Sequence, residues 1–269
     1  MPPLAARNPE MQSLRRLLRR RSARSDAGRY VIEGPRLVLE ALEAGVVVES
    51  VYVPVDAAGD DVDALVARCR ASGIDPTPLA AGALEQVAST QAPQPALALA
   101  VIVSPDLATV VQAVVDPLVL VLCDVADPGN VGTLIRVAEA AGAHAVVVCG
   151  EAAVDVHNPK VVRAAAGSLF RVPVVAQEDA HAVLVTLRSL GLRTVATAMD
   201  APEDYDGEDL RGPAAVVLGN EAHGLAPAVL DLVDVTVRIP MLGAVESLNV
   251  GVAGSVLAFE AARQRRRHR

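Results

Sequence analysis

Short, Val-rich apolar runs alternate with stretches of helical spacing along the chain from residue 118 onward. Five of these runs are bounded by turn residues and are predicted to be strands: 118–123, 145–149, 192–196, 214–218 and 233–238. Apolar positions three and four residues apart predict helices at 131–141, 159–166, 179–190, 225–232 and 249–262. Continuously apolar strands that alternate with helices form parallel sheets covered on both faces. This part of the chain is therefore predicted to be an α/β domain.

The first hundred residues show a second, smaller α/β pattern. Helical spacing covers 8–21, 35–45, 62–69 and 82–87, and strand-like runs cover 30–32, 46–53 and 97–103. A proline at 105 follows the last of these runs, which indicates a boundary there. We expect a domain over 1–104, a linker with a first helix over 105–116, and a larger domain over 117–269.

Composition limits the cellular setting. The three cysteines, Cys69, Cys123 and Cys149, are far apart and form no CxxC pair, which argues against a disulfide framework or a metal site. The N-terminus has no apolar segment typical of a signal peptide, and the longest apolar runs are too short for a membrane span. The sequence predicts a soluble, cytoplasmic protein without a metal ion.

Charge is distributed unevenly. The net charge is −8, yet residues 1–36 hold nine arginines against three acids, and the last nine residues hold five arginines. We expect the first cluster to contact RNA phosphates through Arg15, Arg16, Arg19 and Arg20. The alternative is a solvated helix face and a solvated tail. Aromatic residues make up only 2% of the chain, so a stacking platform for single-stranded bases is not expected.

Three strands run directly into polar, Gly-bearing loops: Asp124–Gly132, Gly219–Gly224 and Ile239–Asn249. Because ligands of parallel sheets bind beyond the carboxyl ends of the strands, these loops predict a single site. The site contains neither the spacing of a dinucleotide fingerprint nor a phosphate-binding G-K-[ST] loop, which argues against an NAD enzyme or an NTPase.

The three loops resemble the three motifs of the SpoU (TrmH) family of RNA ribose methyltransferases, in the SPOUT superfamily. The matching stretches are Asn130-Val-Gly-Thr-Leu-Ile-Arg136, Leu218-Gly-Asn-Glu-Ala-His-Gly-Leu225 and Ile239-Pro-Met-Leu-Gly-Ala-Val-Glu-Ser-Leu-Asn-Val250. The resemblance covers roughly residues 117–262. A looser likeness, Tyr30 to Gly34, is to the substrate-binding domain of members that act on ribosomal RNA.

The resemblance implies a fold that the periodicity does not. It implies a deep trefoil knot in the C-terminal parallel-sheet domain, a small ribosomal-protein-like α/β domain at the N-terminus, and a homodimer with the active site near its interface. It also implies 2'-O-methylation of a structured RNA, most of all 23S ribosomal RNA, with S-adenosylmethionine as methyl donor.

The resemblance also implies roles for individual residues. The catalytic candidates all lie within the three motifs: Asn130, Arg136, Glu221, Ser247 and Asn249. The cofactor-binding candidates lie at strand ends or in the loops after them: Thr197, Ala198, Leu218, Gly219, Ile239, Met241 and Leu248. For Asn130, Ser247 and Asn249 the competing interpretation is a helix N-cap. Glu221 is expected to hold Arg136 or the substrate, or alternatively to bond loop amides.

Arg136 is often described in this family as the base that accepts the ribose proton. A guanidinium has a pKa above about 12 and is a poor proton acceptor. We therefore expect Arg136 to bind phosphate and align the substrate.

Three alternatives stay open. One is a transfer-RNA ribose methyltransferase, the second is a non-catalytic RNA-binding or assembly protein with the same fold, and the third is an antibiotic-resistance methyltransferase acting on ribosomal RNA.

Overall fold

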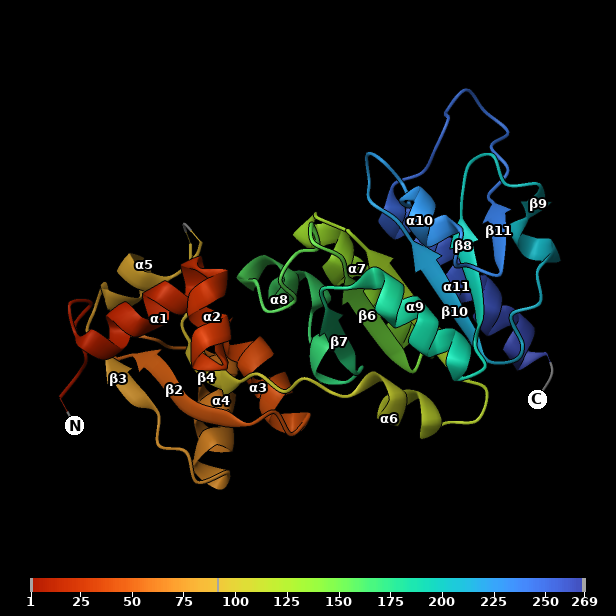
Figure 1. The fold of residues 1–269 in the computed structure, drawn as a ribbon. Coiled ribbons are helices and arrows are strands. Elements are labelled where there is room, and N and C mark those ends of the chain that lie inside the picture. Colours follow the sequence, from red (N-terminus) through yellow and green to blue (C-terminus); the bar gives the residue numbers. More distant parts are fainter. Residues whose placement is uncertain (1, 91, 268–269) are drawn as a thin grey trace. The chain divides into compact units, whose positions relative to one another are not determined.

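The computed structural model describes residues 2–90 and 92–267, which form two compact units (Figure 1). The first unit comprises the chain up to Val103 together with His157–Phe170. The second comprises Ser104–Val156 and the chain from Arg171 onward. The chain thus passes between the units at three points in the sequence.

The first unit is built around a four-stranded sheet in the order β1-β4-β2-β3. Strand β4 pairs antiparallel with β1 and β2, and β2 pairs parallel with β3. Its strands are β1 (Arg29–Glu33), β2 (Val48–Pro54), β3 (Thr77–Leu79) and β4 (Leu97–Val101). Its helices are α1 (Pro9–Arg19), α2 (Arg21–Ala27), α3 (Pro35–Glu43), α4 (Asp60–Ala71), α5 (Ala83–Val87), α8 (Pro159–Ala165) and the short 3-10 turn η1 (Ser168–Phe170).

Alternating side chains of this sheet build two cores. Val31, on one face of β1, packs with Leu14 and Leu17 of α1. Tyr30 and Ile32, on the opposite face, pack with residues of α3, α4 and α8. Because successive side chains of a strand point to opposite faces, the consecutive apolar residues of β1 contribute to both cores.

The predicted helix over 8–21 is interrupted at Arg20. That residue has an extended backbone (φ −125°, ψ 122°) and separates α1 from α2. The apolar spacing predicted α1 but not the break. Beyond it, Arg24 of α2 is buried and donates from Nη1 to the carbonyl oxygen of Leu17 at 2.5 Å, which ties α2 to α1.

The second unit contains a seven-stranded sheet in the order β7-β6-β5-β10-β8-β11-β9, and every pairing in it is parallel. Its strands are β5 (Leu118–Cys123), β6 (Ala145–Cys149), β7 (Val174–Gln177), β8 (Arg193–Thr197), β9 (Glu203–Asp204), β10 (Ala214–Leu218) and β11 (Val235–Arg238). Its helical segments are α6 (Leu107–Gln112), α7 (Pro128–Ala141), α9 (Ala180–Ser189), η2 (Tyr205–Gly207), α10 (Pro227–Leu230) and α11 (Val250–Arg266). The predicted parallel-sheet α/β class is confirmed.

Both faces of this sheet are buried. Val119 and Val121 of β5 pack toward a core that includes residues of α6 and α9. On the opposite face, Gly254 of α11 lies close to Leu134 of α7 and Leu218 of β10; an added Cβ would lie 2.4 and 2.5 Å from their methyl carbons. Residues 118–122 are fully buried, which explains why this strand is an unbroken apolar run.

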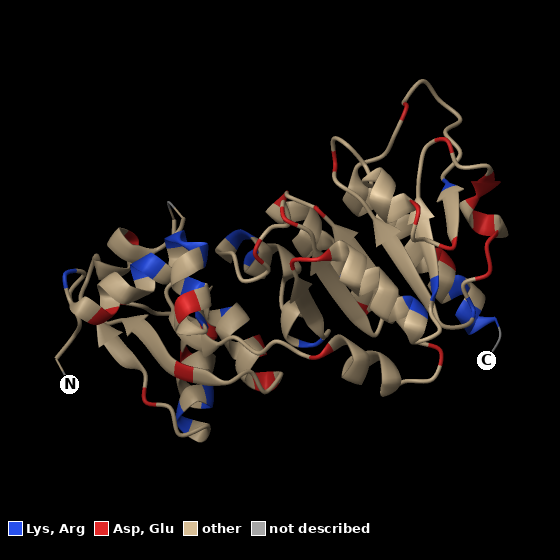
Figure 2. Ribbon diagram, viewed as in Figure 1, with Lys and Arg blue, Asp and Glu red and all other residues tan. Residues whose placement is uncertain are grey.

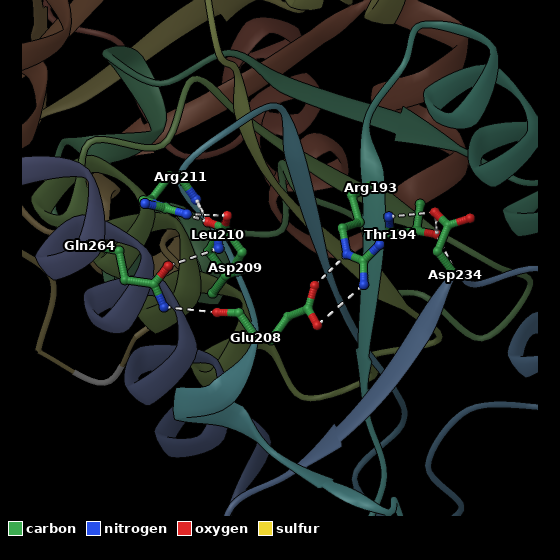
Figure 3. A network of polar contacts seen from close by, with 8 residues as sticks. All are labelled: Arg193, Thr194, Glu208, Asp209, Leu210, Arg211, Asp234 and Gln264. Carbon is green, nitrogen blue, oxygen red and sulfur yellow. Dashed lines mark hydrogen bonds and ion pairs between the residues drawn. The ribbon is translucent and has the colours of Figure 1, made fainter. Parts of the chain in front are cut away.

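Polar contacts anchor the last helix near its C-terminal end. Gln264 accepts a hydrogen bond from the backbone N–H of Leu210 at 2.8 Å and donates to the carbonyl of Glu208 at 2.9 Å (Figure 3). The Glu208 carboxylate forms an ion pair with Arg193 at the start of β8. Arg265 donates to four backbone carbonyls, those of Asp116, Pro117, Leu210 and Gly212. Part of the basic C-terminal cluster thus stabilises the fold, while His268 and Arg269 lie outside the described residues.

Candidate functional site

The three polar loops begin at the carboxyl edge of the second unit's sheet. Strands β5 and β10 are neighbours, with Leu122 paired to Leu218 near their ends. Strand β8 separates β10 from β11, so the Thr197–Ala198 turn begins between the second and third loops. The N–H of Ala198 donates to the carbonyl of Val237 at 3.0 Å, which ties that turn to β11.

The loop after β10 is closed on itself. The backbone N–H groups of Asn220 and Gly224 each donate to the other's carbonyl at 2.9 Å. A Cβ on Gly219 would lie 2.4 Å from the carbonyl carbon of Gly224 and 2.6 Å from the nitrogen of Leu225. Glycine at 219 is therefore required by the close approach of two backbone segments.

Glu221, within this closed loop, contacts the start of α7. Its carboxylate accepts hydrogen bonds from the N–H of Asp127 at 3.1 Å, the N–H of Ala126 at 3.3 Å and Nδ2 of Asn130 at 2.9 Å. Burial opposes ionisation, but the hydrogen bonds from Asn130 and the backbone outweigh it, so the pKa of Glu221 lies below its ordinary value. Glu221 is thus an anionic acceptor that fixes the loop before α7.

Asn130 connects Glu221 to the third loop. While its Nδ2 donates to Glu221, its Oδ1 accepts from Nδ2 of Asn249 at 3.0 Å. Asn249 is the N-cap of α11, and its Oδ1 accepts from the N–H of Gly251 at 2.8 Å. Since a carboxylate only accepts and a backbone N–H only donates, the two ends fix the orientation of both amides. The three hydrogen bonds are therefore donated in one direction, from Gly251 to Asn249, from Asn249 to Asn130 and from Asn130 to Glu221. This chain of hydrogen bonds, called the relay below, connects all three loops.

The N-cap interpretation holds for Asn249 but not for Asn130 or Ser247. Helix α7 begins earlier than predicted, at Pro128, and Asp127 is its N-cap, accepting from the N–H of Asn130 at 2.9 Å. Ser247 is exposed and makes no recorded hydrogen bond within residues 2–90 and 92–267. Asn130 thus has a side chain whose bonds serve the loops and not its own helix.

Arg136 lies further along α7 than Asn130. It is exposed, as are Thr133 and Ala140 at helical spacing on the same side. The structure records no ion pair or hydrogen bond between Arg136 and any described residue, Glu221 included. Its guanidinium is therefore available to a phosphate or other anion.

The cofactor candidates fall into two groups. Ile239, Met241 and Leu248 are half-buried apolar residues in or next to the third loop, and Thr197 and Ala198 are half-buried at the end of β8. Leu218 and Gly219 are fully buried, and the side chain of Leu218 is directed at α11. The first group can offer apolar surface to a ligand, whereas Leu218 and Gly219 can offer only backbone atoms.

The arginines expected to contact RNA lie on α1 and the α1–α2 junction, where Figure 2 shows basic residues gathered. Arg16, Arg19 and Arg20 are exposed and Arg15 is half-buried. None of the four forms an ion pair with a described residue. An unneutralised basic helix face of this kind favours phosphate binding.

Sequence reasoning missed three residues that hold the site together: Asp124, Asp127 and Asn220. Asp127 before Pro128 is a typical helix start, and that signal was available. The roles of Asp124 and Asn220 depend on which loops meet, which no local pattern indicates.

The fold and the site define an α/β protein whose ligand site lies at the carboxyl edge of a parallel sheet and is built from three strand-end loops. The profile of the SpoU rRNA Methylase family matches residues 117–259, and that of the MRM3-like substrate binding domain matches residues 8–98. The chain belongs to the SpoU rRNA methylase family, as the three motifs predicted.

Individual relatives agree with this assignment. The 23S rRNA (guanosine(2553)-2'-O)-methyltransferase RlmP of Bacillus subtilis is 31% identical over 95% of this chain and 96% of its own length. The 23S rRNA (guanosine-2'-O-)-methyltransferase RlmB of Ralstonia nicotianae is 42% identical over 149 residues, which span 55% of this chain and 59% of that protein. The crystal structure of the SpoU methyltransferase AviRb from Streptomyces viridochromogenes, in complex with AdoMet, superposes with a TM-score of 0.86 at 30% identity, covering 97% of this chain and 100% of that one.

No helix among the described residues is both long and apolar enough to cross a bilayer. No group of three or more His, Cys, Asp or Glu side chains is placed to hold a metal ion in that part of the chain.

Proposed function

We propose that this protein transfers a methyl group from S-adenosylmethionine to a ribose 2'-hydroxyl of ribosomal RNA, with 23S ribosomal RNA as the substrate. The observation that supports it most is the relay from Asn249 through Asn130 to Glu221. It joins the three family motifs into one site at the edge where parallel sheets bind ligands.

The residues present fit the methyl donor. Ile239, Met241 and Leu248 would offer apolar contacts to an adenine ring, and the backbone of Leu218 and Gly219, with the Thr197–Ala198 turn, would offer polar contacts. When bound, S-adenosylmethionine supplies a sulfonium methyl group, and its transfer to oxygen needs alignment more than acid–base catalysis.

The side chains around the relay would align the ribose. Asn130 and Asn249 each keep a second amide N–H beyond those used in the relay, and Ser247 keeps its hydroxyl, so all three can bond sugar oxygens. The guanidinium of Arg136 would hold an RNA phosphate with its fork of donors. Transfer of the methyl group from the sulfonium sulfur to the ribose oxygen would release the hydroxyl proton, which would pass to water.

The first unit would hold the RNA. Its arginines Arg15, Arg16, Arg19 and Arg20 would contact phosphates, which positions a substrate without reading its sequence. Tyr30 and Tyr52 are buried in its cores and cannot stack on bases. The functional division at residues 104 and 117 remains a prediction, with 1–104 as substrate-binding part and 117–269 as methyltransferase part.

We also propose a homodimer, which the exposed apolar side of α11 supports. Val252 and Phe259, seven positions apart and so on one face, are 49% and 45% exposed. The trefoil knot, the absence of a metal requirement and a cytoplasmic location stay predictions from the sequence.

The test is methyl transfer from labelled S-adenosylmethionine to separate pools of unmodified ribosomal and transfer RNA. The modified ribose is located by its resistance to alkaline cleavage. We expect label in 23S ribosomal RNA. Label only in transfer RNA would overturn the substrate, and absence of both label and cofactor binding would favour a non-catalytic RNA-binding protein.

A further inference from the structure

Asp124 and Asn220, which lie in two of the three loops of the candidate site, join the ends of neighbouring strands. The β5–β10 ladder extends to the pair Leu122 and Leu218. Two residues beyond each of these, Nδ2 of Asn220 donates to the carbonyl oxygen of Asp124 at 2.9 Å. A side-chain amide thus continues the ladder after the backbones have diverged into their loops.

The amide of Asn220 has a fixed orientation. Its Oδ1 accepts from the N–H of Ala222 at 2.9 Å and from the N–H of His223 at 3.2 Å, while its nitrogen donates across to β5. Reversing the amide would place oxygen against a carbonyl and nitrogen against two N–H groups. One side chain therefore shapes the closed loop and also ties that loop to β5.

Asp124 extends the connection to a third strand. It lies in the left-handed region (φ 56°), its N–H donates to the carbonyl of Cys149 at 2.8 Å, and its Oδ1 accepts from the N–H of Ala152 at 2.9 Å. Aspartate tolerates this backbone conformation better than most residues. The ends of β5, β6 and β10 consequently meet at Asp124.

We infer that Asn220 and Asp124 are positioning residues for methyl transfer, an inference that rests on the proposed function. Glu221 directly follows Asn220, and its backbone partners Ala126 and Asp127 lie two and three residues after Asp124. The bond between Asn220 and Asp124 therefore sets the register in which Glu221 meets Asn130. Neither positioning residue needs to touch RNA or cofactor.

The test uses Asn220→Asp. An aspartate still accepts from Ala222 and His223 but cannot donate to Asp124, and it places a negative oxygen against that carbonyl. Single-turnover methyl transfer at saturating cofactor and ribosomal RNA is expected to fall about 10- to 100-fold, because a small misplacement of aligned groups has a cost of this size. The dissociation constants for cofactor and RNA are expected to stay unchanged.

Asn8→Asp is the matched control. Asn8 caps α1 with its Oδ1, and its amide nitrogen makes no recorded bond to a described residue, so the same chemical change should leave the rate unchanged.

A second pair of variants covers the case in which Asn220→Asp fails to fold. Asp124→Gly suits the positive φ but loses the bond to Ala152, whereas Asp124→Asn keeps an acceptor there. We expect the first to be slow and the second to be near the original rate. If the unaltered protein transfers methyl groups and both Asn220→Asp and Asp124→Gly do so at the same rate, the positioning role is overturned while the proposed function stands. Absence of methyl transfer by the unaltered protein to any RNA would overturn the proposed function as well.

Discussion

Nη1 of Arg163 lies 2.6 Å from Oε1 of Glu33, a residue 130 positions earlier in the chain. The Glu33 side chain is 6% exposed, and Ser89 supplies two further hydrogen bonds to it, from its N–H at 3.1 Å and from its hydroxyl. Arg163 belongs to α8, in the segment between β6 and β7, yet it neutralises a buried acid of the first unit. The segment His157–Phe170 is thus part of that unit's core, with Val162 among its buried residues.

Replacing Arg163 by Ala should destabilise the first unit. Removing one partner of a buried pair leaves an uncompensated charge, and we expect a loss of about 2–4 kcal/mol in the free energy of unfolding, since Arg163 itself keeps some solvent contact. Urea unfolding followed by circular dichroism measures it. Arg211→Ala, which breaks an exposed pair with Asp209, should leave the free energy of unfolding close to that of the unaltered protein, because solvent screens an exposed pair. If both substitutions lower the free energy of unfolding equally, the ion pair with Arg163 is not what stabilises the buried Glu33 carboxylate.

Glu221 should make stability depend on pH in acid. Its folded-state pKa is lowered from the ordinary value of 4.5, so its contribution is fully present above pH 4.5 and is lost as the pH falls through the folded-state pKa. Glu221→Gln removes this titration. The stability difference between the two proteins is therefore expected to be constant from about pH 5.5 to 8, as about one unit above 4.5 suffices for ionisation, and to shrink below pH 4.5. A difference that grows in acid would mean that Glu221 binds its proton more tightly when folded.

The sequence predicted the centre of the large sheet better than its margins. Strands β5, β6 and β10 occupy the residues predicted, because strands buried on both faces are unbroken apolar runs bounded by turns. Strand β7 was missed because it is short and half of it is exposed, and β9 has only two residues.

For the site, the sequence predicted which loops come together but not which side chains bond to one another. Strand-end positions placed the three loops at one edge, but the partners of each polar side chain depend on tertiary distances. Nothing in the local pattern pairs Asn130 with Asn249, which are 119 positions apart, or places α8 against β1. Those contacts follow from how distant segments pack and not from local propensity.

Replacing Arg15, Arg16, Arg19 and Arg20 together by Ala should weaken RNA binding in a salt-dependent way. If each arginine neutralises one phosphate, the slope of log K against log salt should become smaller by about 3–4. Cofactor binding should not change, because these residues belong to the first unit. Filter binding at several salt concentrations provides the measurement, with Arg70→Ala as control because exposed Arg70 lies on α4, across the sheet from α1. An unchanged slope would remove this helix from the RNA-binding surface.

Gly219→Ala should open the closed loop after β10 while the sheet stays folded. The added carbon would lie 2.4–2.6 Å from backbone atoms of Gly224 and Leu225, and backbone cannot rotate away as a side chain can. Opening the loop displaces Glu221 from Asn130, so we expect methyl transfer to fall by about 100-fold. Gly207→Ala is the matched control, since its added carbon meets nothing within 4 Å. Circular dichroism and single-turnover rates separate the two effects: a native spectrum with lost activity supports the role of the closed loop, and full activity would show that Glu221 reaches Asn130 without it.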